Sequence, residues 1–388
     1  MLYSEDRILT THAGSLPRPT DLREMVVAKA AGEDYGEAEF QSSLTDAVAG
    51  VVAKQAEIGI DSVNDGEFSK INFTNYVRER LGGFEKRNPE DITTYQLDMT
   101  ARDRVKFQAY FEAIPPRYTR SNMGVAVCTG PLTYIGEDQL RADLTNFKAA
   151  SEAAGVTEAY LPANTPGTIE HWMPNEHYKS DEEFVFAIAE AMAEEYAAIV
   201  DAGLYVQIDD AHLPFMYDRM VPPASLAEYR AWAGLRIDAL NHALAGIPED
   251  RVRYHICWGS FNSPHLGDVA LADIVDLVLK VNAGAYAIEG ANPRHAHEWR
   301  IWEDVKLPDG KTLIPGVVTH STNIVEHPEL VAERLAQFAG LVGAENLMAG
   351  TDCGFAQGPL VRRVHPSVQW AKLEALAEGA AIASGRLW

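Results

Sequence analysis

A histidine and a cysteine stand two residues apart in the segment Tyr254-His255-Ile256-Cys257-Trp258-Gly259. The apolar and β-branched residues before the glycine are typical of a buried strand. Side chains at positions i and i+2 of a strand point to the same face, so His255 and Cys257 can reach one point in space. An imidazole and a thiol at such a point supply half of a tetrahedral metal site. Because buried cysteines and histidines also occur in ordinary cores, other segments must supply the remaining ligands.

The segment belongs to a regular alternation of predicted strands and helices. Candidate strands lie near nine positions, namely residues 10, 63, 126, 160, 207, 255, 287, 317 and 348, and a helix is predicted over 268–282. Such alternation predicts parallel strands joined by right-handed crossovers. Eight strands close a barrel, so we assign the strand near 126 to an irregular excursion around residues 80–150. We predict an α/β fold, a (β/α)8 TIM barrel forming a single catalytic domain over 1–388, with an open doubly wound sheet as the alternative.

Active sites of such barrels lie at the C-terminal ends of the strands. Those ends collect acidic residues, imidazoles and thiols, among them Ser15, Glu67, Asp209, His255, Cys257, Glu289, His320 and Cys353. Two thiolates, one imidazole and one carboxylate suit four-coordinate Zn²⁺. We therefore predict a zinc cofactor held by His255, Cys257, Glu289 and Cys353. In the alternative interpretation Cys353 only packs in the core and Glu289 caps a helix.

Three further strand-end residues indicate what such a zinc ion would act on. Zinc deprotonates a bound thiol, which makes a substrate thiolate available at neutral pH. Glu67 and Asp209 are both acidic and favour a substrate that carries an ammonium group. Ser15 lies in a Gly-Ser turn whose backbone N–H groups can bind an anion. Together these residues predict an amino-acid thiol as substrate, unless the two carboxylates only make structural hydrogen bonds.

Short motifs recur in a fixed order along residues 8–360: THAGSLPRP at 11–19, DGEF at 65–68, PGTIEHW at 166–172, QIDD at 207–210, HIC at 255–257, AIEG at 287–290, VVTHSTN at 317–323 and GTDCG at 350–354. In this order they resemble the catalytic half of cobalamin-independent methionine synthase, within a wider group related to uroporphyrinogen decarboxylase. The resemblance implies a methyltransferase of methionine biosynthesis that binds zinc through His255, Cys257, Glu289 and Cys353. It also implies that the motif of Ser15 holds the carboxylate of homocysteine and that Glu67 and Asp209 hold its amine. His320 would help to move a proton, and Trp172 would stack on a folate methyl donor.

The chain departs from this pattern on the side of the alkyl donor. It lacks the duplicate N-terminal barrel of the long enzymes, and QIDD followed by Ala-His replaces the usual QIDEPA. The donor, whether a folate, a methylated corrinoid protein or a small alkyl donor such as an epoxide, therefore stays open. One alternative is a zinc enzyme like epoxyalkane:coenzyme M transferase, whose sulfonate would need a cation such as Arg18, Lys70 or Arg117. Another is a decarboxylase-like enzyme without zinc.

The expected partners are a small-molecule thiol and an alkyl donor, and composition argues against two other classes of partner. The 388 residues carry a net charge of −23, which argues against nucleic acid or an anionic membrane surface as partner. There is no secretory signal and no run of 18 apolar residues. Three cysteines give no disulfide framework, so we expect a cytoplasmic protein, and a homo-oligomer stays open. The run Asn292-Pro-Arg-His-Ala-His297 looks like a metal-binding segment, but it follows Glu289 in a loop and we assign it no ligand.

Overall fold

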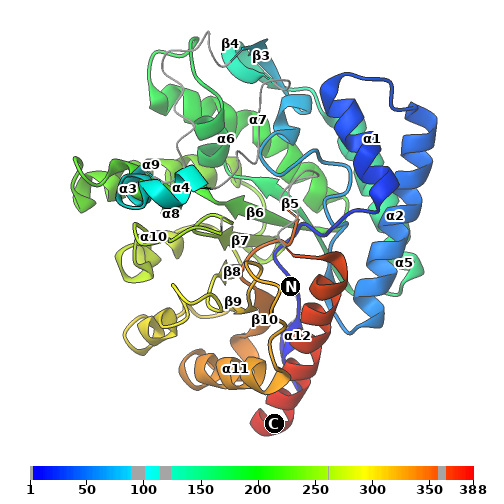
Figure 1. Cartoon of the computed structure of the whole chain (residues 1–388), viewed down its shortest axis with the longest axis vertical. Coiled ribbons are helices and arrows are strands. Elements are labelled where there is room, and N and C mark those ends of the chain that lie inside the picture. The colour runs from blue at the N-terminus through cyan, green and yellow to red at the C-terminus, as the bar shows by residue number, and fades with distance from the viewer. Residues whose placement is uncertain (1–2, 89–100, 114–123, 261, 357–363) are drawn as a thin grey trace.

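A sheet of eight parallel strands forms the centre of the computed structural model, which describes residues 3–88, 101–113, 124–260, 262–356 and 364–388 (Figure 1). The strand order is β1-β10-β9-β8-β7-β6-β5-β2. In chain order the strands are β1 (Leu9–Thr10), β2 (Ser62–Val63), β5 (Glu158–Asn164), β6 (Tyr205–Asp210), β7 (Val252–Ile256), β8 (Ala285–Ile288), β9 (Thr312–Val318) and β10 (Met348–Thr351). The outermost strands of this order also meet, because the Asp61 N–H donates to the Thr10 carbonyl over 3.1 Å. The predicted α/β barrel is confirmed.

The interior of the barrel explains why these segments form strands. All residues of β5, β7 and β9 are buried, as expected for parallel strands covered on both faces. Arg253 of β7 crosses the interior and donates to Ser62 Oγ over 3.0 Å and to Thr11 Oγ1 over 3.1 Å. Its guanidinium also lies 3.8 Å from the centre of the Tyr160 ring. The buried charge thus ties strands from opposite parts of the chain together.

Helices surround the sheet (Figure 1). They are α1 (Thr20–Ala31), α2 (Glu37–Glu57), α5 (Glu137–Ala153), α6 (Pro166–Trp172), α7 (Asp181–Asp201), α8 (His212–Met220), α9 (Leu226–Ala243), α10 (Val275–Val278), α11 (Pro328–Val342) and α12 (Pro366–Leu387). None of those within the described ranges is long and apolar enough to cross a bilayer. The helix expected over 268–282 is wrong in extent, since only a 3-10 turn (Leu271–Asp273) and α10 form. Tertiary contacts override propensity there, and the Leu271 N–H donates to Glu298 over 2.8 Å.

The excursion contains an antiparallel pair, β3 (Leu81–Arg87) and β4 (Val125–Tyr134), and two short helices, α3 (Ala101–Lys106) and α4 (Gln108–Ala113). The strand near 126 lies outside the eight-stranded sheet, as predicted. The excursion ends earlier than expected, because α5 packs on α2 as a helix of the barrel. Strand β3 was not predicted. The buried carboxylate of Glu195 anchors the pair by accepting hydrogen bonds from the hydroxyls of Tyr76 and Tyr134, both over 2.9 Å.

Candidate active site

Two adjoining cavities lie at the C-terminal ends of the strands. The first, the sulfur pocket, is lined by Ala13, Ser15, Glu67, Phe73, Asp209, Ala211, His255, Cys257, Ser260, Cys353 and Gly354. The second, the histidine cavity, measures about 360 Å³ and is lined by Gly259, Asn262, Ser263, Pro264, His265, Glu289, Asn292, Pro293, Arg294, His295, His320, Ser321 and Thr322. Gly259 lines the histidine cavity and its neighbour Ser260 lines the sulfur pocket. The backbone after β7 therefore forms part of a wall that the two cavities share.

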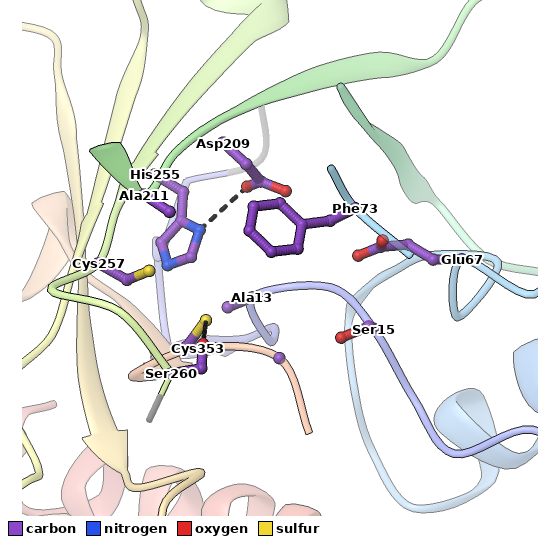
Figure 2. A pocket seen from close by; sticks show the side chains of 11 residues that line it. Ala13, Ser15, Glu67, Phe73, Asp209, Ala211, His255, Cys257, Ser260 and Cys353 are labelled. Carbon is purple, nitrogen blue, oxygen red and sulfur yellow. Dashed lines mark hydrogen bonds and ion pairs between the residues drawn. The ribbon is translucent and has the colours of Figure 1, made fainter. Parts of the chain in front are cut away.

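The two predicted thiol ligands meet in the sulfur pocket. Figure 2 shows the sulfur atoms of Cys257 and Cys353 on the same side of the His255 ring. The thiols share a hydrogen bond, which lowers the pKa of Cys353. The same hydrogen bond, together with burial, raises the pKa of Cys257. Ser260 Oγ lies 3.0 Å from the Cys353 sulfur. The two thiols are therefore in direct contact within the pocket.

The His255 ring is fixed at both nitrogens. Its Nδ1 lies 3.0 Å from Asp209 Oδ1 (Figure 2), and its Nε2 lies 3.2 Å from the Asp352 carbonyl. Burial opposes a charge on this ring, but the hydrogen bond and the negative charge of Asp209 outweigh it and raise the pKa of His255 to about 9. Gln207 Nε2 donates to the same Asp209 oxygen over 2.9 Å. Such a carboxylate partner orients a metal-binding histidine.

Glu289 lies on the wall of the histidine cavity rather than in the sulfur pocket. Its Oε2 accepts a hydrogen bond from Asn292 over 2.8 Å, whereas its buried Oε1 has no donor within the described residues. Burial, and then the charges of Asp352 and Cys353, raise its pKa well above the usual range. A buried carboxylate oxygen without a donor is costly, and a cation is one group that would satisfy it.

Three of the four predicted ligands line the sulfur pocket, whereas Glu289 lines the neighbouring cavity, so the four do not form a ready coordination shell. Within the ranges that the structure describes, no group of three or more His, Cys, Asp or Glu side chains is arranged to hold a metal ion. The donor types nevertheless fit zinc, because thiols, an imidazole oriented by a carboxylate and a carboxylate oxygen are groups that bind it.

Glu67 faces the sulfur pocket from a strained turn. Its φ is +59°, and its N–H is held by Asp65 Oδ1 over 2.8 Å. A Cβ atom at Gly14 would lie 2.8 Å from Glu67 Oε1, so glycine there leaves room for the carboxylate. Burial raises the pKa of Glu67 to about 7, a rise that Lys70 opposes and Asp209 supports. Figure 2 shows the Phe73 ring between the carboxylates of Glu67 and Asp209.

Ser15 lies at the opposite rim of the sulfur pocket from the Asp209 carboxylate (Figure 2). Its carbonyl accepts a hydrogen bond from the Phe355 N–H over 2.8 Å, and its Oγ accepts one from the Ala356 N–H over 3.3 Å. The loop after β1 is thereby joined to the loop after β10, which carries Cys353. The two loops place a hydroxyl and a thiol on one small cavity.

His320 is buried and lines the histidine cavity together with Glu289. Its loop is held by Glu326, whose Oε1 accepts a hydrogen bond from the Thr319 N–H over 2.9 Å. The other oxygen of Glu326 pairs with Lys372 Nζ of α12 over 2.7 Å, and the Lys372 side chain is completely buried. An ion pair in the core thus links the C-terminal helix to the loop of His320.

Trp172 lines neither cavity. It ends α6 and makes edge-to-face contacts with His171 and His212, at centroid distances of 5.3 and 5.4 Å. The indole is buried within this aromatic group. Its role in stacking on a methyl donor stays a prediction.

The cations weighed for a sulfonate are engaged elsewhere. Arg18 donates to the carbonyl of Phe68 over 3.0 Å and also to those of Glu67 and Lys70. Lys70 donates to the Pro162 carbonyl and lies 4.2 Å from the centre of the Tyr76 ring. Arg117 lies outside the described residues. Neither Arg18 nor Lys70 is among the residues that line the sulfur pocket.

The loop 292–297, to which no ligand was assigned, takes part in a charged network that the sequence did not reveal. His295 Nε2 lies 2.9 Å from Asp268 Oδ2, and its Nδ1 lies 2.8 Å from Glu298 Oε2. Burial opposes the charge on this ring, but the two carboxylates outweigh it and raise the pKa of His295 to about 9. The ring stacks on Trp258 at 4.1 Å. The two closely spaced histidines of this run indicated a polar site. The sequence could not reveal the network, however, because Asp268, the partner of His295, lies 27 positions away.

Comparison with known proteins decides the family. The sequence pattern of the family described as cobalamin-independent synthase, catalytic domain, matches residues 8–162 and 161–372. The chain belongs to this family. The resemblance seen in the motifs is therefore confirmed.

Individual relatives are distant in sequence but match over most of the chain. A methionine synthase of Sulfolobus acidocaldarius is 26% identical over 348 residues, covering 89% of this chain and 85% of the relative. A 2-hydroxypropyl-CoM lyase of Xanthobacter autotrophicus is 25% identical and covers 100% of this chain and 98% of the relative. The fold matches that of a B12-independent methionine synthase from Shewanella in complex with selenomethionine, with a TM-score of 0.72, 21% identity, and coverage of 98% and 99% of the two chains.

Proposed function

We propose that this protein catalyses zinc-dependent transfer of a methyl group to the thiol of homocysteine, giving methionine. The observation that carries the proposal is the composition of the sulfur pocket, where two thiols and His255 face two carboxylates and Ser15. The name of the Sulfolobus acidocaldarius relative, methionine synthase, supports the same reaction.

His255, Cys257, Cys353 and Glu289 would hold the zinc. Once bound, zinc would stabilise the substrate thiol as a thiolate, the nucleophilic form. Asp209 would keep the His255 ring in its orientation through the Nδ1 hydrogen bond. Glu289 would be the ligand that yields its place to the substrate sulfur, since it is a hard oxygen donor among sulfurs and lies on the far side of the shared wall.

The remaining residues of the pocket would bind the amino-acid part of the substrate. Glu67 and Asp209 together favour an ammonium group, and Phe73 beside them limits the access of water. The motif of Ser15 would hold the carboxylate. An ammonium group and a carboxylate fixed at two points orient the thiol toward Cys257 and Cys353, which converts binding energy into positioning of the nucleophile.

The donor would enter through the histidine cavity. At about 360 Å³, this cavity is large enough for a small ligand or for the reactive end of a larger one. We assign His320 the task of accepting the proton that the substrate thiol releases, since it lines this cavity beside Glu289. A folate or another methyl donor would then present its carbon to the thiolate. Stacking of such a donor on Trp172 would require movement of the aromatic group around it.

A thiol alkyltransferase acting on coenzyme M is the second candidate, because a 2-hydroxypropyl-CoM lyase matches over the whole chain. A sulfonate would call for a cation at the sulfur pocket. Arg18 and Lys70 instead donate to backbone carbonyls, and two carboxylates line the pocket. These contacts favour homocysteine over coenzyme M.

A screen of thiols against alkyl donors, on protein whose zinc content has been measured, tests the proposal. Isothermal titration in two buffers of different ionisation heat should show that homocysteine releases a proton when it binds. A proton released with coenzyme M but not with homocysteine would favour the second candidate. If the protein binds no zinc, the result would favour the alternative of a decarboxylase-like enzyme without zinc.

We further propose that residues 1–388 work as one catalytic domain in a reducing cytoplasm. The support for the compartment is that Cys257 and Cys353 are free thiols in contact with each other. An oxidising compartment would join such a pair and abolish the site.

A further inference from the structure

Two strained residues lie one on each cavity. Among the described residues other than glycine, Glu67 and His265 alone have a positive φ, at +59° and +54°. Glu67 lines the sulfur pocket and His265 the histidine cavity. Such a conformation is strained and persists only where the surroundings enforce it, which is common at functional sites. Glu67 already has a proposed role, whereas His265 has none.

The backbone around His265 is held by helix α3 of the excursion, which lies beside α8 (Figure 1). The Leu266 N–H donates to Asp103 Oδ2 over 3.0 Å, and the Gly267 carbonyl accepts a hydrogen bond from Arg102. Arg102 is itself fixed by Asp218 Oδ1 over 3.0 Å. The two residues that follow His265 are therefore both tied to α3.

The side chain of His265 is held by an alternating chain of imidazoles and carboxylates. Its Nδ1 lies 3.0 Å from Asp268 Oδ2, the same oxygen that His295 Nε2 approaches to 2.9 Å. Burial raises the pKa of Asp268, but the hydrogen bonds from both histidines outweigh this and lower it overall. Asp268 therefore remains a carboxylate and keeps a proton on Nδ1 of His265. Nε2 is then the ring nitrogen that gains and loses a proton.

We propose that His265 is the catalytic acid for the alkyl donor. This inference rests on the proposed function. The thiolate electron pair forms the new S–C bond, and the pair of the breaking C–N or C–O bond stays on the leaving heteroatom. That atom takes a proton from Nε2 of the His265 imidazolium, which becomes neutral imidazole. The donor is accordingly one whose leaving atom is a basic nitrogen or oxygen, since a halide, a sulfonium sulfur or a corrinoid cobalt needs no proton to leave.

The roles of His265 and His320 differ in this scheme. His320 lies beside Glu289 and accepts the proton lost by the thiol. His265 lies on the loop braced by α3 and supplies the proton gained by the leaving group. Both histidines line one cavity. After each reaction, His320 can therefore lose its proton and His265 can regain one within that cavity, and no proton has to cross the sulfur pocket.

The test compares donors that need a proton with one that does not. Zinc-loaded protein and homocysteine are assayed with 5-methyltetrahydrofolate, with epoxypropane and with methyl iodide, each corrected for the rate without protein. His265→Asn should lower transfer from the first two donors by about 10²–10⁴-fold and change transfer from methyl iodide by less than about threefold. Asparagine tolerates a positive φ, so the loop keeps its conformation. His297→Asn, an exposed histidine of a neighbouring loop, is the matched control and should leave all three rates unchanged.

Three outcomes overturn the assignment. One is an equal loss with all three donors in His265→Asn, which would indicate a structural role. Another is an unchanged rate with the proton-requiring donors. The third is wild-type protein that accelerates transfer from methyl iodide alone. Absence of any transfer to homocysteine in wild-type protein, methyl iodide included, would instead reject the proposed function, so the two failures are distinguishable.

A readout independent of activity tests the hydrogen bond that orients the ring. In protein with ¹⁵N-labelled histidine, the His265 resonances are identified by their loss in His265→Asn. They should show a proton fixed on Nδ1, which Asp268→Asn abolishes. A wild-type ring with its proton on Nε2 alone would contradict the proposed geometry.

Discussion

The sulfur pocket and the histidine cavity share a wall but are built in different ways. Most polar side chains of the sulfur pocket stand on strands or within a few residues of their ends. Asp209 and His255 are direct neighbours across β6 and β7, so sheet register alone brings them together. The histidine cavity is lined by loops after β7, β8 and β9, and one of these depends on contacts with α3. In the proposed reaction, the barrel would therefore fix the chemistry of the thiol, whereas loops and the excursion would set the chemistry of the donor.

If the proposed function is correct, this difference would account for relatives that carry different names. A methionine synthase and a 2-hydroxypropyl-CoM lyase both match this chain over most of their length. Thiol activation can stay constant when the strand ends stay constant. Changes in loops that no strand constrains would then alter which donor the thiolate attacks. Variants on each side of the shared wall should therefore affect different halves of the reaction.

The largest effect is expected from the thiols of the sulfur pocket. Cys257→Ser and Cys353→Ser should each reduce bound zinc to a small fraction of one ion per chain and lower methyl transfer by about 10³-fold or more. Elemental analysis of the purified proteins measures the metal. Cys128→Ala is the control, because Cys128 is buried in β4 and lines neither cavity. Full zinc content in either serine variant would disprove the ligand assignment.

Glu67 should be the next most sensitive position. Glu67→Gln should raise the KM for homocysteine by about 100-fold, since it removes one charge of a buried pair. The deamino analogue of homocysteine, a mercaptobutyrate, should show a far smaller change in its KM. Because burial raises the pKa of Glu67 to about 7, its carboxylate is present above pH 7 and lost below. The KM for homocysteine in wild-type protein should therefore rise as the pH falls from 8 to 6. Equal losses for both thiols would remove Glu67 from the amine site.

Asp209 is proposed both to orient His255 and to bind the substrate amine. Removing its charge should therefore lower the affinity for zinc. Asp209→Asn removes the charge that orients His255 and should weaken zinc binding by about 10- to 100-fold. Competition with a chromophoric chelator measures this. Gln207, which donates to the same Asp209 oxygen, provides a milder comparison through Gln207→Met, which removes that hydrogen bond but adds no charge. An unchanged zinc affinity in Asp209→Asn would reject the role of Asp209 in metal binding and leave only its role in binding the substrate amine.

The smallest effect is expected from the brace on the far side of the wall. Arg102→Ala should lower the transfer rate by about tenfold, since small misplacements of an acid reduce catalysis, and should leave zinc content and homocysteine affinity within a factor of two. The exposed Arg104 of the same helix gives the control variant Arg104→Ala. A loss of homocysteine affinity in Arg102→Ala would show that the two cavities are not independent.

What could be predicted from the sequence also differs between the sulfur pocket, which strand ends form, and the histidine cavity, which loops form. His255 and Cys257 could be paired because a strand has a period of two, and Cys353 could be added because strand ends of a barrel converge. His265 could not be recognised, since Asp103, which holds the residue after it, lies 163 positions from Leu266. The helix over 268–282 was over-extended for a related reason. Hydrogen bonding from Leu271 to Glu298 is a tertiary contact that local periodicity does not contain.

The buried pair of Lys372 and Glu326 has a consequence for how the active site assembles as the chain folds. Glu326 holds the backbone beside His320, and its only described cationic partner lies on α12, a helix that follows all eight strands of the barrel in the chain. Before α12 docks, a carboxylate without its counter-ion is costly to bury, and the His320 loop is left without its support. The loop of His320 thus gains its full support only when α12 has docked on the barrel.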